Sequence, residues 1–214
     1  LHEFAAVKRE TGAWLLVDEA HSLGVLGEQG RGLAEAEGVE ADVDFVVGTF
    51  SKSLGAIGGY CVSDDPEFDI LRVACRPYMF TASMPPSIVA SVEAALRHVE
   101  AHPELRTRLW ANVNQLYGTL ERRGFVLGPD KSPVVAVHLP NPAIATQIWH
   151  ELLLDGVYVN LTLPPATPNN TALLRCSVCA AHDSEELATV ADKLTAIAKR
   201  HGLIGQAMPL AAAG

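Results

Sequence analysis

Three short apolar runs in the first 63 residues limit the folds that this chain can adopt. They span residues 14–17, 45–48 and 58–63, and glycine-rich turns or helical segments separate them. A helical pattern over residues 3–10 precedes the first run. Apolar runs of this length are typical of strands that are buried on both faces of a parallel or mixed sheet. The pattern therefore predicts an α/β fold.

Reactive polar residues follow the first two runs. Asp18 and His21 follow the first run, and Thr49, Ser51 and Lys52 follow the second. Positions beyond strand ends are typical of ligand sites on open α/β sheets. An acid for a pyridine nitrogen, an amine for an aldehyde and hydroxyls for a phosphate are what a protein needs to hold pyridoxal phosphate. Residues 16–59 therefore predict a pyridoxal phosphate site.

Each residue of this predicted site also has an ordinary interpretation. Lys52 lies among small residues that leave room for a planar cofactor, and surroundings that disfavour its ammonium form would prepare it to bond an aldehyde. It could instead be a surface lysine. Asp18, at the end of a strand expected to be buried, requires a cation such as a protonated pyridine nitrogen, or it could cap the next turn. His21 is either a donor to the phenolic oxygen of the cofactor or an ordinary polar histidine.

The rest of the chain predicts a second, smaller domain. A long helical pattern starts at Pro85 and Pro86, is interrupted at Pro103 and stops at Gly124. Strand, helix, strand, strand and helix then follow, over residues 133–140, 141–156, 157–163, 171–178 and 183–202. This order is typical of an α+β domain.

The expected organisation has three parts. The chain begins inside a helical pattern without a methionine, so we expect it to be the C-terminal part of a longer protein. Residues 1–104 would be part of a large sheet domain, residues 105–204 a small α+β domain, and residues 205–214 a flexible tail. Asp183 or Ser184 is expected to cap the last helix, with Glu185 or Glu186 in its first turn.

Further candidate residues lie outside the stretch from 16 to 59. The hydroxyls of Thr81 and Ser83, next to a helix start, could bind a phosphate or merely cap the helix. Arg175 ends an apolar run, and its guanidinium could receive a carboxylate or form an internal ion pair. Cys176 and Cys179 form one C-x-x-C pair without the second pair that a structural zinc site needs, so we expect both to be buried.

Charge and composition exclude several other classes of protein. The net charge of −9 disfavours nucleic acid or an anionic membrane surface as the main partner. Four cysteines in 214 residues do not form a disulfide scaffold, which favours the cytoplasm. No apolar stretch approaches the length of about 20 residues that spans a bilayer. The D-E-A-H motif also occurs in helicases, but these 214 residues contain no phosphate loop of that kind, so an upstream segment would have to supply it; the acidic charge and the Lys52 segment count against this alternative. A non-catalytic binding module is a further alternative that no motif supports.

The motifs together resemble one enzyme family. They are VDEAHSLGVLGEQGRG, DFVVGTFSKSLGAIGGY, RPYMFTASMPPS, YVNLTLPPATP and LLRCSVCAAH, and the likeness extends from about residue 3 to 200. The chain resembles the α-oxoamine synthases, pyridoxal phosphate enzymes of fold type I. The resemblance implies a homodimer with a shared active site, and the condensation of an amino acid with an acyl-CoA. GTFSKS, RPYMFTAS and PPATP point to the branch that forms 3-oxosphinganine from L-serine and palmitoyl-CoA; the alternative is a sister enzyme that uses glycine or alanine.

The resemblance also implies a role for each candidate residue. Lys52 matches the lysine that bonds the cofactor aldehyde and moves the α-proton, Asp18 the partner of the pyridine nitrogen, and His21 the histidine beside the phenolic oxygen. The remaining matches are Thr49 and Ser51 with phosphate or ring contacts, Thr81 and Ala82 with phosphate contacts from the second subunit, and Arg175 with the arginine for the substrate carboxylate. The chain has Leu163 where members of the 3-oxosphinganine branch often carry an arginine.

Overall fold

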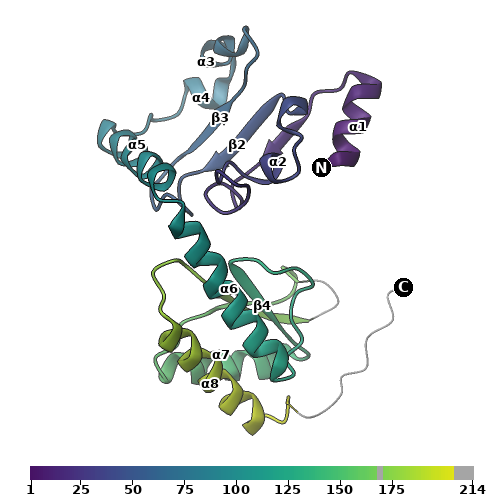
Figure 1. Ribbon diagram of the computed structural model, residues 1–214, viewed down its shortest axis with the longest axis vertical. Helices are drawn as coiled ribbons and strands as arrows, with labels where there is room; N and C mark the ends of the chain where they lie inside the picture. The colour runs from purple at the N-terminus through teal and green to yellow at the C-terminus, as the bar shows by residue number, and fades with distance from the viewer. Residues whose placement is uncertain (168–170, 205–214) are drawn as a thin grey trace. The chain divides into compact units, whose positions relative to one another are not determined.

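The computed structural model describes residues 1–167 and 171–204, and the predicted flexible tail lies outside them. The chain divides into two compact units, Leu1–Arg106 and Thr107–Gly214 (Figure 1). Each unit contains one sheet of three strands among the described residues. We describe the two units separately.

The sheet of the first unit is mixed. Its strands are β1 (Leu16–Asp18), β2 (Phe45–Thr49) and β3 (Gly59–Val62), in the order β1-β2-β3 (Figure 1). β1 and β2 are parallel, and β2 and β3 are antiparallel. All three predicted runs form strands, but β1 begins two residues later than predicted.

The prediction that these strands are buried on both faces is wrong for the described chain. Leu16 in β1 and Val62 in β3 are 56% and 51% exposed. The reason is that β1 and β3 are the two edges of a three-stranded sheet, and the described elements leave these side chains uncovered. Only Val17 is buried in β1.

Helices of the first unit precede and follow the sheet strands. They are α1 (His2–Thr11), α2 (Leu33–Ala36), α3 (Leu71–Ala74), α4 (Arg76–Met79) and α5 (Pro86–Ala101), with short 3₁₀ turns η1 (Glu40–Asp42) and η2 (Phe68–Ile70). The predicted start at Pro86 is confirmed, with Pro85 as the N-cap. The predicted interruption at Pro103 is also confirmed, because α5 ends at Ala101 and α6 (Glu104–Arg122) begins after the proline.

The second unit follows the predicted order of elements. After α6 come β4 (Val134–Leu139), α7 (Pro142–Leu154), β5 (Asn160–Thr162), β6 (Ala172–Ser177) and α8 (Ser184–Arg200). The sheet is antiparallel, with the order β4-β6-β5. Alternate residues of β4 and β6 are buried against α6, α7 and α8, which places the core on one face of the sheet.

Backbone capping fixes the ends of the helices in this unit. Gly124, with φ of 86°, ends the turn after α6, as predicted. Asp183 is the N-cap of α8, and it exchanges two hydrogen bonds with Glu186 in a capping box. The two open alternatives at this cap are thereby resolved to Asp183 and Glu186.

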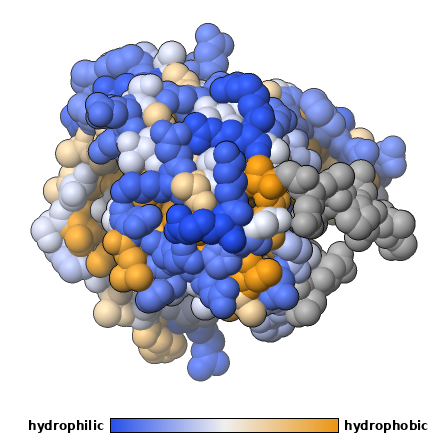
Figure 2. Space-filling model, turned by 90° about the horizontal axis from the view of Figure 1, so that it is seen from below, coloured by the Kyte–Doolittle hydropathy of each residue, from blue (hydrophilic) through white to orange (hydrophobic). Residues whose placement is uncertain are grey.

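One face of the described surface carries no continuous apolar band. The face in Figure 2 is mainly hydrophilic, with apolar residues in small separate patches. Within residues 1–167 and 171–204, the helices are all too short or too polar to cross a membrane.

Candidate active site

The candidate active site lies at the carboxyl ends of β1 and β2. Asp18 is the last residue of β1 and pairs with Val47 of β2. The amide of Glu19 donates a hydrogen bond of 2.8 Å to the carbonyl of Val47. Lys52 follows three residues after Thr49, the last residue of β2. Because β1 and β2 are parallel, the turn with Asp18 and the loop with Lys52 leave the sheet at the same end.

One apolar cluster holds three predicted cofactor segments in the first unit. Its members are Phe50, Leu54 and Val92, with Leu23 and Met84 among the residues packed against them. Leu23 follows His21 by two residues, and Leu54 follows Lys52 by two residues. Met84 directly follows residues 81–83. The turn with Asp18 and His21, the loop with Lys52 and the Thr81 segment are therefore anchored in one place.

Close approaches between glycines and side chains tighten this arrangement. A Cβ atom on Gly24 would lie 3.0 Å from the Cβ of Ser53, so the turn after His21 touches the residue next to Lys52. A Cβ on Gly58 would overlap the sulfur of Met84. Side chains at these two positions would push the segments apart.

Polar groups of the site are open to the surroundings. Lys52 is exposed, and its amine has no partner among the described residues. One carboxylate oxygen of Asp18 accepts a hydrogen bond of 2.8 Å from the amide of Ala20. The Oγ1 of Thr49 lies 2.8 Å from the Oγ of Ser51 and donates to the carbonyl of Gly58. The hydroxyl pair therefore forms one polar group beside Lys52.

Two expectations about this site are corrected. Asp18 is exposed rather than desolvated at the end of a buried strand, since β1 is an edge strand. Its bond to Ala20 is the capping contact that the ordinary interpretation described. Lys52 is exposed as well, so the described residues do not supply the burial that the sequence argument required. His21, Ser51, Thr81 and Ala82 are also exposed.

Two residues near the site were missed by the sequence analysis. Glu19, between Asp18 and His21 in the sequence, is 1% exposed and accepts hydrogen bonds from Leu33 and Ala34. Tyr60 stacks on Phe50, with 5.5 Å between the ring centroids. Burial raises the pKa of Tyr60, and the charges of Glu19 and Asp18 raise it further. The only signal in the sequence was that both residues lie inside the family motifs.

Arg175 belongs to the second unit. It lies in β6 between Ala136 of β4 and Asn160 of β5, and it is partly exposed. Its neighbours Leu174 and Cys176 point into the helical core, so the guanidinium lies on the other face of the sheet. Within residues 1–167 and 171–204, no carboxylate pairs with it.

The two cysteines of the C-x-x-C pair differ in their exposure to solvent. Cys176 is 4% exposed, and burial raises its pKa to about 12. Cys179 is exposed, so the prediction that both are buried is wrong for this residue. Cys179 lies in the turn beyond β6, where its carbonyl accepts a hydrogen bond from Asn112 while the thiol faces outward.

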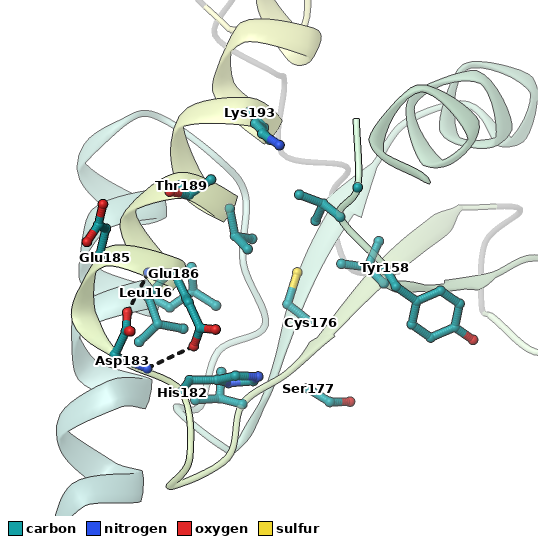
Figure 3. Close-up of a pocket in the computed structure, with 16 residues that line it drawn as sticks. Leu116, Tyr158, Cys176, Ser177, His182, Asp183, Glu185, Glu186, Thr189 and Lys193 are labelled. Carbon is teal, nitrogen blue, oxygen red and sulfur yellow. Dashed lines mark hydrogen bonds between the residues drawn. The ribbon is translucent and has the colours of Figure 1, made fainter. Parts of the chain in front are cut away.

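A cavity lies in the second unit, between α8 and the ends of β5 and β6 (Figure 3). Its volume is about 590 Å³. Val157, Val178 and Leu187 give it apolar walls, while His182 and Lys193 line it with polar groups. Lys193 donates to the carbonyl of Asp155. None of the predicted site residues lines this cavity.

Comparisons with known proteins establish the family. The family model "Aminotransferase class I and II" matches residues 1–194, and the chain belongs to this family. A serine palmitoyltransferase of Caulobacter vibrioides is 58% identical over 208 residues, which are 97% of this chain and 50% of that protein. An 8-amino-7-oxononanoate synthase of Pelobacter propionicus is 38% identical, over 95% of this chain and 53% of that protein.

The solved structures that resemble this chain include enzymes of the same kind as these relatives. A serine palmitoyltransferase of Sphingomonas wittichii is 47% identical with a TM-score of 0.92, over 95% of this chain and 52% of that one. A second solved structure, of SPT with a PLP internal aldimine, is 48% identical with the same TM-score and coverage. The chain spans about half the length of these relatives. The predicted fold type I and the resemblance to the α-oxoamine synthases are confirmed.

Proposed function

We propose that the protein is a pyridoxal phosphate-dependent acyltransferase that condenses L-serine with a long-chain acyl-CoA. The products would be 3-oxosphinganine, CoA and carbon dioxide. The observation that carries the proposal is the meeting of the Asp18 turn with the Lys52 loop at one sheet edge. The 58% identity to a serine palmitoyltransferase supports the choice of substrates.

The residues at this edge fit the cofactor chemically. Asp18 has a carboxylate oxygen left for the pyridine nitrogen, and the amine of Lys52 is open to an aldehyde. Thr49 and Ser51 offer adjacent hydroxyls for the phosphate or the ring. His21 would donate to the phenolic oxygen. When bound, pyridoxal phosphate supplies an electron sink for the negative charge that develops at the substrate α-carbon.

Protein groups would perform the remaining tasks. Lys52, once released by the amino acid, takes the α-proton as a general base. Asp18 keeps the proton on the pyridine nitrogen through an ionic hydrogen bond. Arg175 receives the carboxylate of serine in a bidentate contact until that group leaves as carbon dioxide. Thr81 and Ala82 would contact the phosphate bound by a second copy of the chain, which makes the homodimer part of the proposal.

A substitution of Lys52 tests the proposal most directly. In the full-length protein, Lys52→Ala should abolish the formation of 3-oxosphinganine and the visible absorbance of bound cofactor. Lys199→Ala is the matched control, because Lys199 lies in the last turn of α8 and is exposed. Its activity should equal that of the parent protein. Undiminished turnover by Lys52→Ala would refute the proposed role.

The choice of amino acid needs a separate experiment. The parent protein should turn over L-serine faster than glycine or L-alanine when each is offered with acyl-CoAs of several chain lengths. Leu163 stands where the 3-oxosphinganine branch often has an arginine, so the comparison also shows whether that exchange changes the preference. A clear preference for glycine or alanine would favour the sister reaction.

A further inference from the structure

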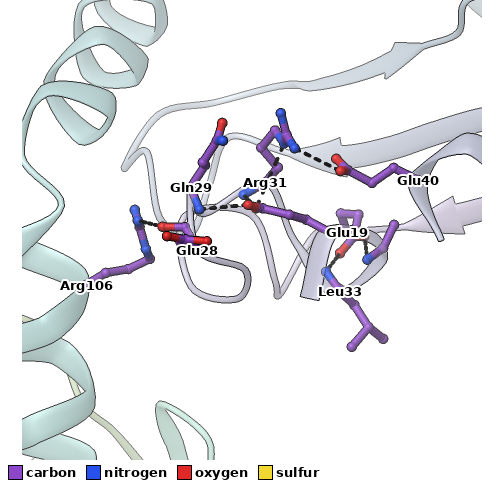
Figure 4. Close-up of polar contacts among 9 residues, drawn as sticks. Glu19, Glu28, Gln29, Arg31, Leu33, Glu40 and Arg106 are labelled. Atoms are coloured by element: carbon purple, nitrogen blue, oxygen red, sulfur yellow. Dashed lines mark hydrogen bonds and ion pairs between the residues drawn. The ribbon is translucent and has the colours of Figure 1, made fainter. Parts of the chain in front are cut away.

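Among the polar and charged residues in the described part of the chain, Glu19 is the most deeply buried. It is 1% exposed, although it directly follows the exposed Asp18. Its Oε2 accepts from the amide of Leu33 at 2.8 Å and from the hydroxyl of Ser22. Its Oε1 accepts from the amide of Ala34 at 2.9 Å. Figure 4 shows Glu19 directed at the backbone of Leu33.

A carboxylate in this position is costly unless donors compensate for the lost water. Three donors surround Glu19, so the charge is compensated by hydrogen bonds. The surroundings are also fitted to its shape. A Cβ on Gly32 would overlap the carboxyl group, and Gly32 has φ of 126°, which other residues rarely adopt. The Glu19 carboxylate therefore occupies space that a side chain at position 32 would fill.

The contacts of Glu19 span the turn that carries the candidate site. Glu19 directly follows β1, and its side chain is buried whereas that of Asp18 is exposed, so the two carboxylates point in different directions. Ser22, which Glu19 binds, directly follows His21. These hydrogen bonds, which we call the Glu19 clamp, tie the turn of residues 19–22 to the first turn of α2. The clamp fixes the backbone that aims the side chains of Asp18 and His21.

The same clamp reaches the lysine loop through its neighbours. Leu23, directly after Ser22, packs against the cluster that contains Leu54. Gly24 lies against Ser53, the residue next to Lys52. A shift of the turn would therefore be transmitted to the loop that carries the amine.

A second carboxylate, that of Glu35, binds the segment of residues 29–31, which follows the turn with Asp18 and His21, and provides a comparison. Glu35 accepts bonds of 2.7 Å from the amides of Gln29 and Arg31. Burial acts to raise the pKa of Glu35, but these two amides and the charges of Arg31 and Arg106 together hold it below its ordinary value. Glu35 contacts neither the turn with Asp18 nor the loop with Lys52 in the described contacts.

We propose that Glu19 is a positioning residue for the cofactor site: its buried carboxylate holds the Asp18–His21 turn, and through Leu23 and Gly24 the Lys52 loop, in the geometry that binds pyridoxal phosphate. The proposal rests on the proposed function for the identity of the cofactor. The clamp itself is independent of the cofactor and is measurable without it.

Glu19→Gln tests the proposal in the full-length protein. The amide keeps the size of the side chain but replaces one acceptor oxygen with a donor that faces donors. We expect pyridoxal phosphate to dissociate at least tenfold more readily, and its induced circular dichroism to change. The KM for acyl-CoA should stay within twofold of the parent value. Ser22→Ala removes one donor only and should weaken cofactor binding by about threefold. It takes the place of Glu19→Gln if that variant does not fold.

Glu35→Gln is the matched control, since it changes a carboxylate that likewise accepts hydrogen bonds from two backbone amides, those of Gln29 and Arg31. It should lower stability while cofactor affinity stays within twofold. Equal losses of cofactor affinity in Glu19→Gln and Glu35→Gln would mean that Glu19 only contributes to the general stability of the loop, and would overturn the proposal. So would cofactor affinity within twofold of the parent in both Glu19→Gln and Ser22→Ala.

Hydrogen exchange in the absence of cofactor separates this inference from the proposed function. The amides of residues 18–24 should exchange at least tenfold faster in Glu19→Gln than in the parent protein. In Glu35→Gln their exchange rates should equal those of the parent. If the parent protein binds no pyridoxal phosphate, the proposed function fails, and the exchange rates still decide whether Glu19 holds the turn. Unchanged exchange of residues 18–24 in Glu19→Gln would overturn the clamp.

Discussion

The ring of Tyr60 occupies the space where a side chain of Gly48 would lie. A Cβ on Gly48 would be 2.6 Å from the Tyr60 hydroxyl oxygen and 2.7 Å from two ring carbons. The two residues are cross-strand partners of β2 and β3. Phe50 stacks on the same ring, with 5.5 Å between the ring centroids. The strand that leads to Thr49 and Lys52 therefore carries a glycine because an aromatic ring lies across it.

Gly48→Ala should destabilise the protein by about 1–3 kcal/mol, since the added methyl group must displace a packed ring. The free energy of unfolding in urea measures the effect. Gly118→Ala in α6 is the matched control, because its nearest neighbour is the end of the flexible Arg122 side chain at 3.2 Å. Removing a helix-interior glycine should stabilise by about 1 kcal/mol. A Gly48→Ala protein as stable as the parent would contradict the packing described.

The sequence predicted the edge of the sheet at which Asp18 and Lys52 meet, because apolar runs locate strands and the residues that follow them. It did not predict the burial of Glu19. The pattern D-E-A-H shows two adjacent acids, and which of them points inward depends on α2, fourteen residues later. The exposure of Asp18 was also missed, since strand position within a sheet is decided by pairing rather than by composition.

The cap of α8 gives a prediction about stability. Asp183→Ala removes the acceptor for the amide of Glu186, which lies at 2.8 Å. The loss should cost about 1 kcal/mol of unfolding free energy. Asp183→Asn keeps an acceptor oxygen and should stay close to the parent protein. A larger loss in Asp183→Asn than in Asp183→Ala would contradict the cap.

An ion pair between α7 and the end of α8 gives a prediction about pH. Arg200 and His201 hold the pKa of Glu151 below its ordinary value of 4.5 through hydrogen bonds of 2.6 Å each. Because the folded state favours the charged carboxylate, its contribution to stability is present above pH 4.5 and is lost as the pH falls through the lowered pKa.

Glu151→Gln should therefore be less stable than the parent at about pH 7, and the difference should shrink as the pH falls to about 3. Urea unfolding across this range measures it. Glu121→Gln is the control, since Glu121 is exposed in α6 and forms no described side-chain contact. A Glu151→Gln difference that grows on acidification would show that the sign is wrong.

The thiols should differ in reactivity. Cys176 is buried and its pKa is raised to about 12, so it carries almost no thiolate near neutral pH. Cys179 is exposed. Brief treatment with iodoacetamide at about pH 8 should label Cys179 and leave Cys176 free, as read by peptide mass spectrometry. Unfolding in guanidinium should make all four cysteines reactive, and labelling of Cys176 before Cys179 in the folded protein would contradict the structure.

Arg175 leads to a prediction about substrate binding. It lies on the face of the second sheet opposite the helical core, without a carboxylate partner among the described residues. If it binds the carboxylate of the amino acid, Arg175→Lys loses the bidentate contact and should raise the KM for serine roughly tenfold to a hundredfold. The KM for acyl-CoA should remain unchanged, because that substrate lacks the carboxylate.

Competition by 2-aminoethanol provides the decisive comparison, since this amine resembles serine without its carboxylate. It should inhibit the parent protein and Arg175→Lys with equal affinity, whereas serine should bind the variant more weakly. Arg122→Ala, at an exposed arginine of α6, should match the parent for both compounds. Arg175→Lys could instead weaken the binding of serine and of 2-aminoethanol equally. The guanidinium would then stabilise the second unit rather than bind the substrate carboxylate, because only a carboxylate contact distinguishes the two molecules.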